Sequence, residues 1–234
     1  MSRRPSARSR PSKAKAPADF RSLRQARAEL VEVGRRLHAR DLVGAAEGNL
    51  SVRLGPDRFL VTGSGVSKGH LTAADLVVVD GRGERVQGTR RASTELRMHL
   101  AAYAARPDVA AIVHAHPITA VALTVAGAPP PSDLVPEAAV TLGPVALAPF
   151  ATPGTDEVPA SLAPFLARHD VILLERHGAI AFGRSLAEAF ERMETLERVA
   201  RIAAAARLLG RCEPLPTAAV DRVLAAAGRP PRAR

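Results

Sequence analysis

Two short apolar runs of this sequence lead directly to histidine. The first, Val109–His116, is rich in aliphatic and β-branched residues and ends in His114-Ala115-His116, just before Pro117. The second, Val171–Leu174, is followed by Glu175-Arg176-His177-Gly178. Apolar runs of four to eight residues bounded by turn residues are typical of buried β-strands. A chain with two such strands requires a covered sheet, and its histidines then stand at strand ends.

The rest of the chain alternates between strand-like and helix-like segments, with an Asp80-Gly81 hairpin signal. Further extended segments are expected at 50–54, 58–62, 76–80, 140–142, 145–147 and 179–182. Helices are expected at 20–40, from 93 or 94 to 106, and at 120–125, 156–167, 185–209 and 218–227. This mixture around one core predicts a single α/β domain over residues 19–228. A disordered basic tail is expected at 1–18 and a short basic tail at 229–234.

The net charge of +10 is concentrated at the two ends of the chain. Nine of the 33 Lys and Arg residues lie in the first fifteen or the last six positions, which leaves 24 basic against 23 acidic residues elsewhere. We therefore expect a nearly neutral folded body and no specific binding of nucleic acid. The N-terminal charge run is typical of a solvated tail, and a polyanion-binding arm is the alternative.

The location of the protein follows from what the sequence lacks. Cys212 is the single cysteine, so no internal disulfide can form, which fits a reducing cytoplasm. No run of about 18 apolar residues is present, and we expect no membrane span. The expected location is the cytoplasm.

His114 and His116 are the sharpest candidates for chemistry. On a strand, residues i and i+2 point to the same face, so the two imidazoles lie side by side as a metal site requires. Taken alone, the pair is a weak signal and is more often a pair of polar strand-end histidines. His177 ends the second strand, and Glu95 lies in the first turn of an expected helix, where a carboxylate also complements the helix dipole. His99, one turn later, is expected to pack or to support the site.

Three turn segments are candidates for binding an anion. They offer backbone N–H groups or hydroxyls at Gly48-Asn49, at Gly63-Ser64 within a Gly-rich turn, and at Ser93-Thr94 before a helix. A helix N-terminus favours bound anions. Each segment alone is compatible with an ordinary turn or cap.

Together these pieces resemble the class II aldolase/adducin family. The resemblance covers about residues 28–209 and is carried, in order, by GNLSVR, TGSGVSKGHLTAADLVVVD, STE-x3-H, VHAHP, APFATPGT and RHG. It implies a mostly antiparallel central sheet flanked by helices, in three α/β/α layers. It also implies a homotetramer with active sites at subunit interfaces.

The resemblance further implies the chemistry of each candidate. His114, His116 and His177 would bind Zn²⁺, or another divalent metal, with Glu95 as fourth ligand and catalytic acid/base. Asn49, Gly63, Ser93 and Thr94 match the phosphate-binding positions, with Gly48 and Ser64 beside them. The expected reaction is retro-aldol cleavage of a phosphorylated ketose to dihydroxyacetone phosphate and an aldehyde through an enediolate. The alternatives are a sugar-phosphate 4-epimerase, a methylthioribulose-phosphate dehydratase, a hydroxy-acid decarboxylase and a non-catalytic adducin-like scaffold.

One segment departs from the fuculose-phosphate aldolases of this family, which use a loop Tyr to protonate the aldehyde oxygen. The corresponding Pro-rich loop, Ala128–Pro136, contains no Tyr. Tyr103, the only Tyr, lies on the helix that follows Glu95. Glu137, just after the loop, is the candidate replacement acid.

Overall fold

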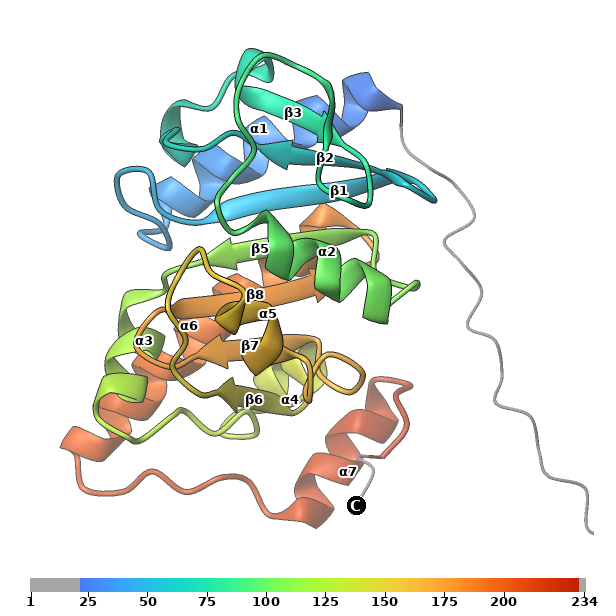
Figure 1. Ribbon diagram of the computed structural model, residues 1–234. Helices are drawn as coiled ribbons and strands as arrows, with labels where there is room; N and C mark the ends of the chain where they lie inside the picture. Colours follow the sequence, from blue (N-terminus) through green and yellow to red (C-terminus); the bar gives the residue numbers. More distant parts are fainter. Residues whose placement is uncertain (1–21, 232–234) are drawn as a thin grey trace, which may run out of the picture.

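The computed structural model describes residues 22–231 as an eight-stranded sheet covered by helices on both faces (Figure 1). The predicted tail at 1–18 and residues 232–234 lie outside the described residues, and the domain boundaries at 19 and 228 stay predictions. The strands are β1 Asn49–Gly55, β2 Arg58–Thr62, β3 Leu76–Val79, β4 Arg85–Gln87, β5 Ala111–Ala115, β6 Val145–Ala148, β7 Val171–Leu174 and β8 Gly178–Gly183. Their order is β4-β3-β2-β1-β5-β8-β7-β6, and among these strands only β6 and β7 pair in parallel. The predicted mostly antiparallel sheet is confirmed.

The helices form two layers around this sheet. Their bounds are α1 Leu23–Ala39, α2 Leu96–Ala105, α3 Ile118–Val125, α4 Pro136–Leu142, α5 Glu157–Leu162, α6 Leu186–Leu208 and α7 Thr217–Ala226, with short 3₁₀ turns η1 Lys68–His70 and η2 Ala73–Asp75. One buried cluster joins the sheet to α1, α3, α4 and α6, and a second joins its other face to α2 and α5. Both clusters are mainly aliphatic, as the scarcity of aromatic residues requires.

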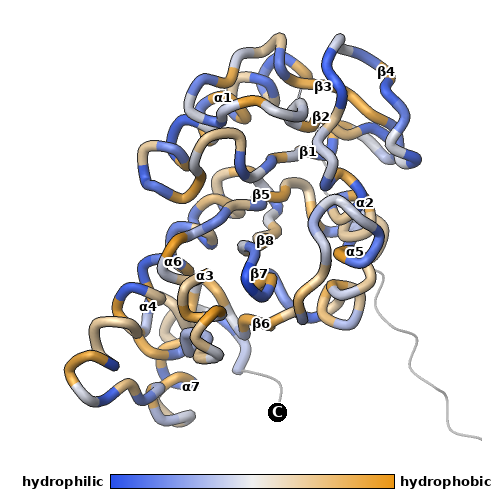
Figure 2. Tube along the Cα trace, turned by 60° about the vertical axis from the view of Figure 1, so that its left-hand side comes forward, coloured by the Kyte–Doolittle hydropathy of each residue, from blue (hydrophilic) through white to orange (hydrophobic). Residues whose placement is uncertain are grey.

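Hydropathy follows this layering. The strands run mainly through hydrophobic segments in Figure 2, while the outer edge around β4, which is exposed along its length, is largely hydrophilic. Edge strands with polar or charged residues resist pairing with other chains. No helix of the described residues is long and apolar enough to span a bilayer.

One expected strand is wrong. Residues 140–142 form the last turn of α4 rather than extended chain. Pro136 occupies the first turn, where its missing N–H costs no hydrogen bond, and Ala138 and Ala139 favour a helix. The β-branched Val140 and Thr141 suggested a strand, but packing of Ala138, Ala139 and Leu142 onto the core decided for a helix.

Candidate active site

The end of β5 fixes the first two histidines. Ile112 packs under α2, and strand alternation turns His114 toward that same face. His114 is completely buried, paired with Asn49 of β1 on one side and Ile180 of β8 on the other. Beyond the strand, the His116 N–H donates to Leu42 O at 2.8 Å, so the chain stays extended. The Nε2 atoms of His114 and His116 lie 3.1 Å apart.

His177 arrives from the tight turn between β7 and β8. Its N–H donates to Leu174 O, and Arg176 in this turn has a φ of 58°. Gly178 follows, and a Cβ there would lie 2.5 Å from Ala115 O and 2.8 Å from His116 Cδ2. Glycine is therefore required at 178 because the turn packs directly against the His114–His116 segment.

Glu95 immediately precedes α2 and points its carboxylate at these imidazoles. Its Oε2 lies 3.1 Å from His114 Nε2 and accepts from Asn49 Nδ2 at 2.9 Å, while Oε1 lies 3.3 Å from His177 Nε2. Oε1 is buried and has no hydrogen-bond donor among the described residues. The helix begins at Leu96, slightly later than expected, with Glu95 as its N-cap residue.

This donor set fits a divalent cation. Each histidine offers a nitrogen within 4.8 Å of the other two, and the three rings meet edge to face. His114 Nδ1 lies 2.9 Å from Ala179 O, an acceptor, so Nδ1 carries a proton and Nε2 is the nitrogen that remains for a metal. This Nε2 lies 3.1 Å from Glu95 Oε2, an arrangement that a positive charge makes favourable. A carbonyl bonded to the far nitrogen is the usual support of a metal-binding histidine.

The protonation of the cluster agrees with this interpretation. Burial lowers the pKa of His116 to about 3 and that of His177 to about 4, with the neighbouring His114 adding to both shifts. Both imidazoles are thus neutral at pH 7, as metal ligation requires. Burial alone would raise the pKa of Glu95, but the hydrogen bond and charge of His114, together with His177 and Asn49, lower it well below its usual range.

The predicted anion-binding segments line a cavity of about 330 Å³ beside the histidines. The cavity contains all six predicted positions: Gly48, Asn49, Gly63, Ser64, Ser93 and Thr94. Gly63 and Ser64 already donate their N–H groups to Asp75 O and Arg91 O, and the Ser93 N–H donates to Thr62 O. The donors that these three residues leave for an anion are therefore the Ser64 and Ser93 hydroxyls.

Similarity to known proteins agrees with this geometry. Residues 28–204 match the model described as the Class II Aldolase and Adducin N-terminal domain. The chain belongs to the class II aldolase/adducin family. It is 32% identical over 189 residues to a 3-oxo-tetronate 4-phosphate decarboxylase from Pectobacterium atrosepticum, covering 79% of this chain and 86% of that protein. It is 35% identical over 155 residues to an Escherichia coli O6:H1 L-fuculose phosphate aldolase, covering 66% and 71%. A solved L-fuculose 1-phosphate aldolase superposes with a TM-score of 0.80 at 31% identity, covering 87% and 96%.

This class II aldolase-family site also contains residues that sequence analysis did not single out. Lys68, only 2% exposed, lines the cavity and donates from Nζ to Ala46 O and Val66 O. Burial lowers its pKa to about 8, although nearby Glu95 opposes the shift. Pro153 and Gly154 line the opposite wall, with Gly154 next to Thr94. A lysine inside a Gly- and Ser-rich turn was the available signal for Lys68, because such turns place backbone and cation around anions.

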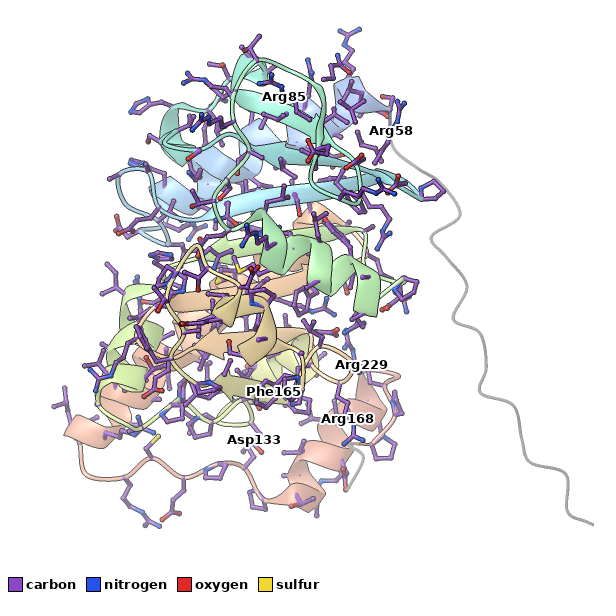
Figure 3. The ribbon with its side chains drawn as sticks, viewed as in Figure 1. Arg58, Arg85, Asp133, Phe165, Arg168 and Arg229 are labelled. Atoms are coloured by element: carbon purple, nitrogen blue, oxygen red, sulfur yellow. The ribbon has the colours of Figure 1, made fainter. Side chains whose placement is uncertain are left out.

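Neither the only tyrosine nor the acid that follows the Pro-rich loop Ala128–Pro136 lies at the histidines. Tyr103 is buried beneath the sheet, where its hydroxyl bonds Ser51 and its ring stacks on Phe59. Glu137 is exposed in the first turn of α4 and does not line the cavity of this chain. Asp133 lies beside the α6–α7 connection, where its carbonyl accepts from Leu215 N (Figure 3). The loop therefore meets the connection to α7 rather than the histidines of its own chain.

Proposed function

We propose that this protein is a zinc-dependent aldehyde-lyase that cleaves a phosphorylated ketose to dihydroxyacetone phosphate and an aldehyde. The observation that carries the proposal is the buried Glu95 Oε1, which has no donor among the described residues and faces three imidazoles beside a hydroxyl-lined cavity. Three neutral histidines leave a metal its full positive charge, which suits catalysis rather than structure. A degenerate scaffold would have lost some of these four groups.

The proposed roles follow from position. His114, His116 and His177 would hold the metal, which when bound would polarise the carbonyl and hydroxyl oxygens of the substrate. Glu95, ionised and facing the same space, would take up and return the proton that cleavage of the carbon–carbon bond requires. Substrate phosphate would bind the hydroxyls of Ser64, Ser93 and Thr94, with Lys68 as the nearby cation. Binding energy from the phosphate would then position carbons that lie closer to the metal.

A second candidate, decarboxylation of a phosphorylated oxo or hydroxy acid, is favoured by the missing loop Tyr. Retro-aldol cleavage leaves an aldehyde oxygen that needs a proton during the reverse reaction, whereas release of carbon dioxide needs no such acid. The only Tyr of the chain, Tyr103, is buried and bonded to Ser51. The Pectobacterium relative carries a decarboxylase name, which supports the same alternative.

The proposed setting is a cytoplasmic homotetramer with active sites at subunit interfaces. Large apolar side chains at Ile118, Val125 and Phe150 are 65%, 49% and 58% exposed near the histidine end of the sheet. Exposed apolar groups of this size are typical of contact surfaces. Such an interface would also allow a neighbouring subunit to supply the acid that the local loop lacks.

A panel of zinc-loaded reactions would test the proposal. Phosphorylated ketoses and oxo acids of four to six carbons would be incubated with the protein, and products would be scored as aldehyde, epimer, dehydrated ketone or carbon dioxide. Aldehyde with dihydroxyacetone phosphate supports the first proposal, and carbon dioxide supports the second. Epimer or dehydrated ketone as the main product would contradict both. The chelated protein is the control, and it should be inactive until zinc is restored.

A further inference from the structure

A buried chain of hydrogen bonds leads away from Glu95 toward the space between β1 and α2. Asn49 Nδ2 donates to Glu95 Oε2 at 2.9 Å, and Asn49 Oδ1 lies 2.5 Å from His99 Nε2. His99 Nδ1 lies 2.7 Å from Ser51 Oγ, and Ser51 Oγ lies 2.8 Å from the Tyr103 hydroxyl. β1 supplies Asn49 and Ser51, two residues apart and on one face, while α2 supplies His99 and Tyr103, one turn apart.

The direction of every bond follows from its two ends. A carboxylate only accepts, so the Asn49 amide nitrogen must face Glu95 and its oxygen must face His99. His99 Nε2 must then carry the proton, which leaves Nδ1 as an acceptor in the neutral ring. Ser51 therefore donates to His99, and the Tyr103 hydroxyl donates to Ser51. All four hydrogen bonds point toward Glu95.

The surroundings keep each member in the form that this direction needs. Asn49, Ser51, His99 and Tyr103 are at most 4% exposed. Burial, with a smaller contribution from His114, lowers the pKa of His99 to about 3, so the ring is neutral at pH 7. Burial also raises the pKa of Tyr103, so its hydroxyl keeps the proton that it donates. Arg53 donates to Tyr103 O and stacks on the ring, which holds the far end in place.

We propose that His99, Ser51 and Tyr103 are positioning residues for Glu95, acting through Asn49; this rests on the proposed role of Glu95 as proton carrier. Without the His99 donor, the Asn49 amide is free to turn over and place its oxygen against the carboxylate. That orientation repels the ionised form of Glu95 and displaces it from the geometry that proton transfer needs. Asn49 is therefore a support of Glu95 as well as part of the cavity wall.

A purely structural role is the competing explanation, because the same bonds join β1 to α2. The two explanations differ in what conservative substitutions do. In His99→Gln the side-chain amide reaches the position of Nε2 and keeps a donor for Asn49. In His99→Asn the amide reaches only the position of Nδ1, and in His99→Leu no donor remains. A packing role ranks these variants by volume and shape, whereas a positioning role ranks them by the donor at the Nε2 position.

The first measurement is the tautomer of His99 in the zinc-loaded protein without substrate, from long-range ¹H–¹⁵N spectra of histidine-labelled samples. His99→Gln identifies the His99 signals by their loss. We expect a neutral ring protonated at Nε2 in the wild type and a mixture of tautomers in Ser51→Ala. A ring protonated at Nδ1 in the wild type would overturn the proposal. Because no turnover is involved, an absence of lyase activity would count against the proposed function alone.

The second measurement separates kcat, KM and zinc content on the substrate that the wild type prefers. We expect His99→Leu to lower kcat by about 10–100-fold with KM and zinc nearly unchanged, the size typical of groups that support a catalytic residue. His99→Gln should stay within a few-fold of the wild type, and Ser51→Ala and Tyr103→Phe should show progressively smaller losses. Phe59→Leu, which alters the packing around Tyr103 and Arg53 but removes none of the four hydrogen bonds, is the control and should keep kcat. Equal kcat for the Gln and Leu variants, or losses confined to KM or zinc, would overturn the proposal.

Discussion

The two ends of the central strands both carry buried or partly buried polar clusters, but among the described residues only one cluster is internally satisfied. At the start of β5, Arg106 bonds Asp108 and Asp170 at 2.8 Å each, and Arg192 bonds Asp170, Glu188 and the Phe182 carbonyl. At the other end, the imidazole nitrogens and the Glu95 carboxylate meet at 3.1 to 3.3 Å, and one carboxylate oxygen has no hydrogen-bond donor among the described residues. In the first cluster each acid has a guanidinium partner, whereas the only charged partner that the second could give its carboxylate is a histidine.

Cavity size alone would not have pointed to the histidines, since a cavity along α1 measures about 660 Å³. The cavity beside Arg106 and Arg192 measures about 470 Å³, against about 330 Å³ beside the histidines. Buried polar groups in native proteins almost always find partners, so a group without one needs an explanation. The difference teaches that polar satisfaction separates a cluster that holds strands together from a cluster suited to binding a ligand.

The largest effect is expected from His114→Ala, which removes one proposed metal ligand and a side chain in contact with Glu95. We expect loss of bound zinc and, with it, of measurable turnover, because two remaining histidines rarely hold a catalytic metal. Zinc content by mass spectrometry and product formation measure both. His70→Ala, at an exposed histidine of η1, is the matched control and should keep zinc and activity. A His114→Ala protein that retained stoichiometric zinc would contradict the assignment of the three histidines as the metal site.

Glu95→Gln should distinguish the proposed role of Glu95 in proton transfer from the proposed role of the histidines in metal binding. The amide keeps the size of the side chain but cannot accept and return a proton, so turnover should fall by about 100-fold or more. Most of the zinc should remain, held by three histidines. Zinc content measured beside kcat tests the separation. Turnover close to the wild-type value would remove Glu95 from the mechanism.

The sequence predicted the parts of this site that depend on neighbouring residues better than the contacts between distant segments. Strand alternation correctly placed His114 and His116 on one face, because that property is local. The contact between Asn49 and Glu95 depends on the β1–β5 register and on the start of α2, which no local pattern specifies. The resemblance brought the segments together, and without it each histidine was compatible with a structural role.

The satisfied end was not predicted at all. Its salt bridges join Arg106 and Arg192 to Asp170, which is 64 residues from the first and on a different element from either. Charged residues at such positions resemble ordinary surface residues in a sequence. Residues 140–142 failed for a related reason, since local β-branching competed with burial against α6 and α7.

Ser93→Asp should have an intermediate effect and sharpens the assignment of the anion cavity. The new carboxylate would stand where the Ser93 hydroxyl lines the cavity, and like charge should raise KM for a phosphorylated substrate by about tenfold, or ~1.4 kcal/mol. KM for the same substrate without phosphate should change less. Zinc content is the internal check, since Ser93 Oγ accepts from Glu95 N and, among the described residues, Ser93 makes no hydrogen bond to the histidines. Equal KM changes for both substrates would place the phosphate elsewhere.

Arg192→Met should have the smallest effect on turnover, because it alters the end of the sheet that is already satisfied. Arg192 is 6% exposed and joins α6 to Phe182 O and to Asp170 and Glu188, acids that remain about one third exposed. Water can therefore solvate the acids that lose their partner, and we expect destabilisation of ~1–3 kcal/mol rather than the larger loss of a fully buried charge. Urea unfolding measures this change, with Arg211→Met, at an exposed pair with Glu213, as the control. Zinc content and kcat per folded molecule should match the wild type. A loss of zinc in Arg192→Met would show that the two ends are coupled through β5 and β8. The salt bridges of Arg192 would then help to hold the three histidines in the geometry that binds zinc.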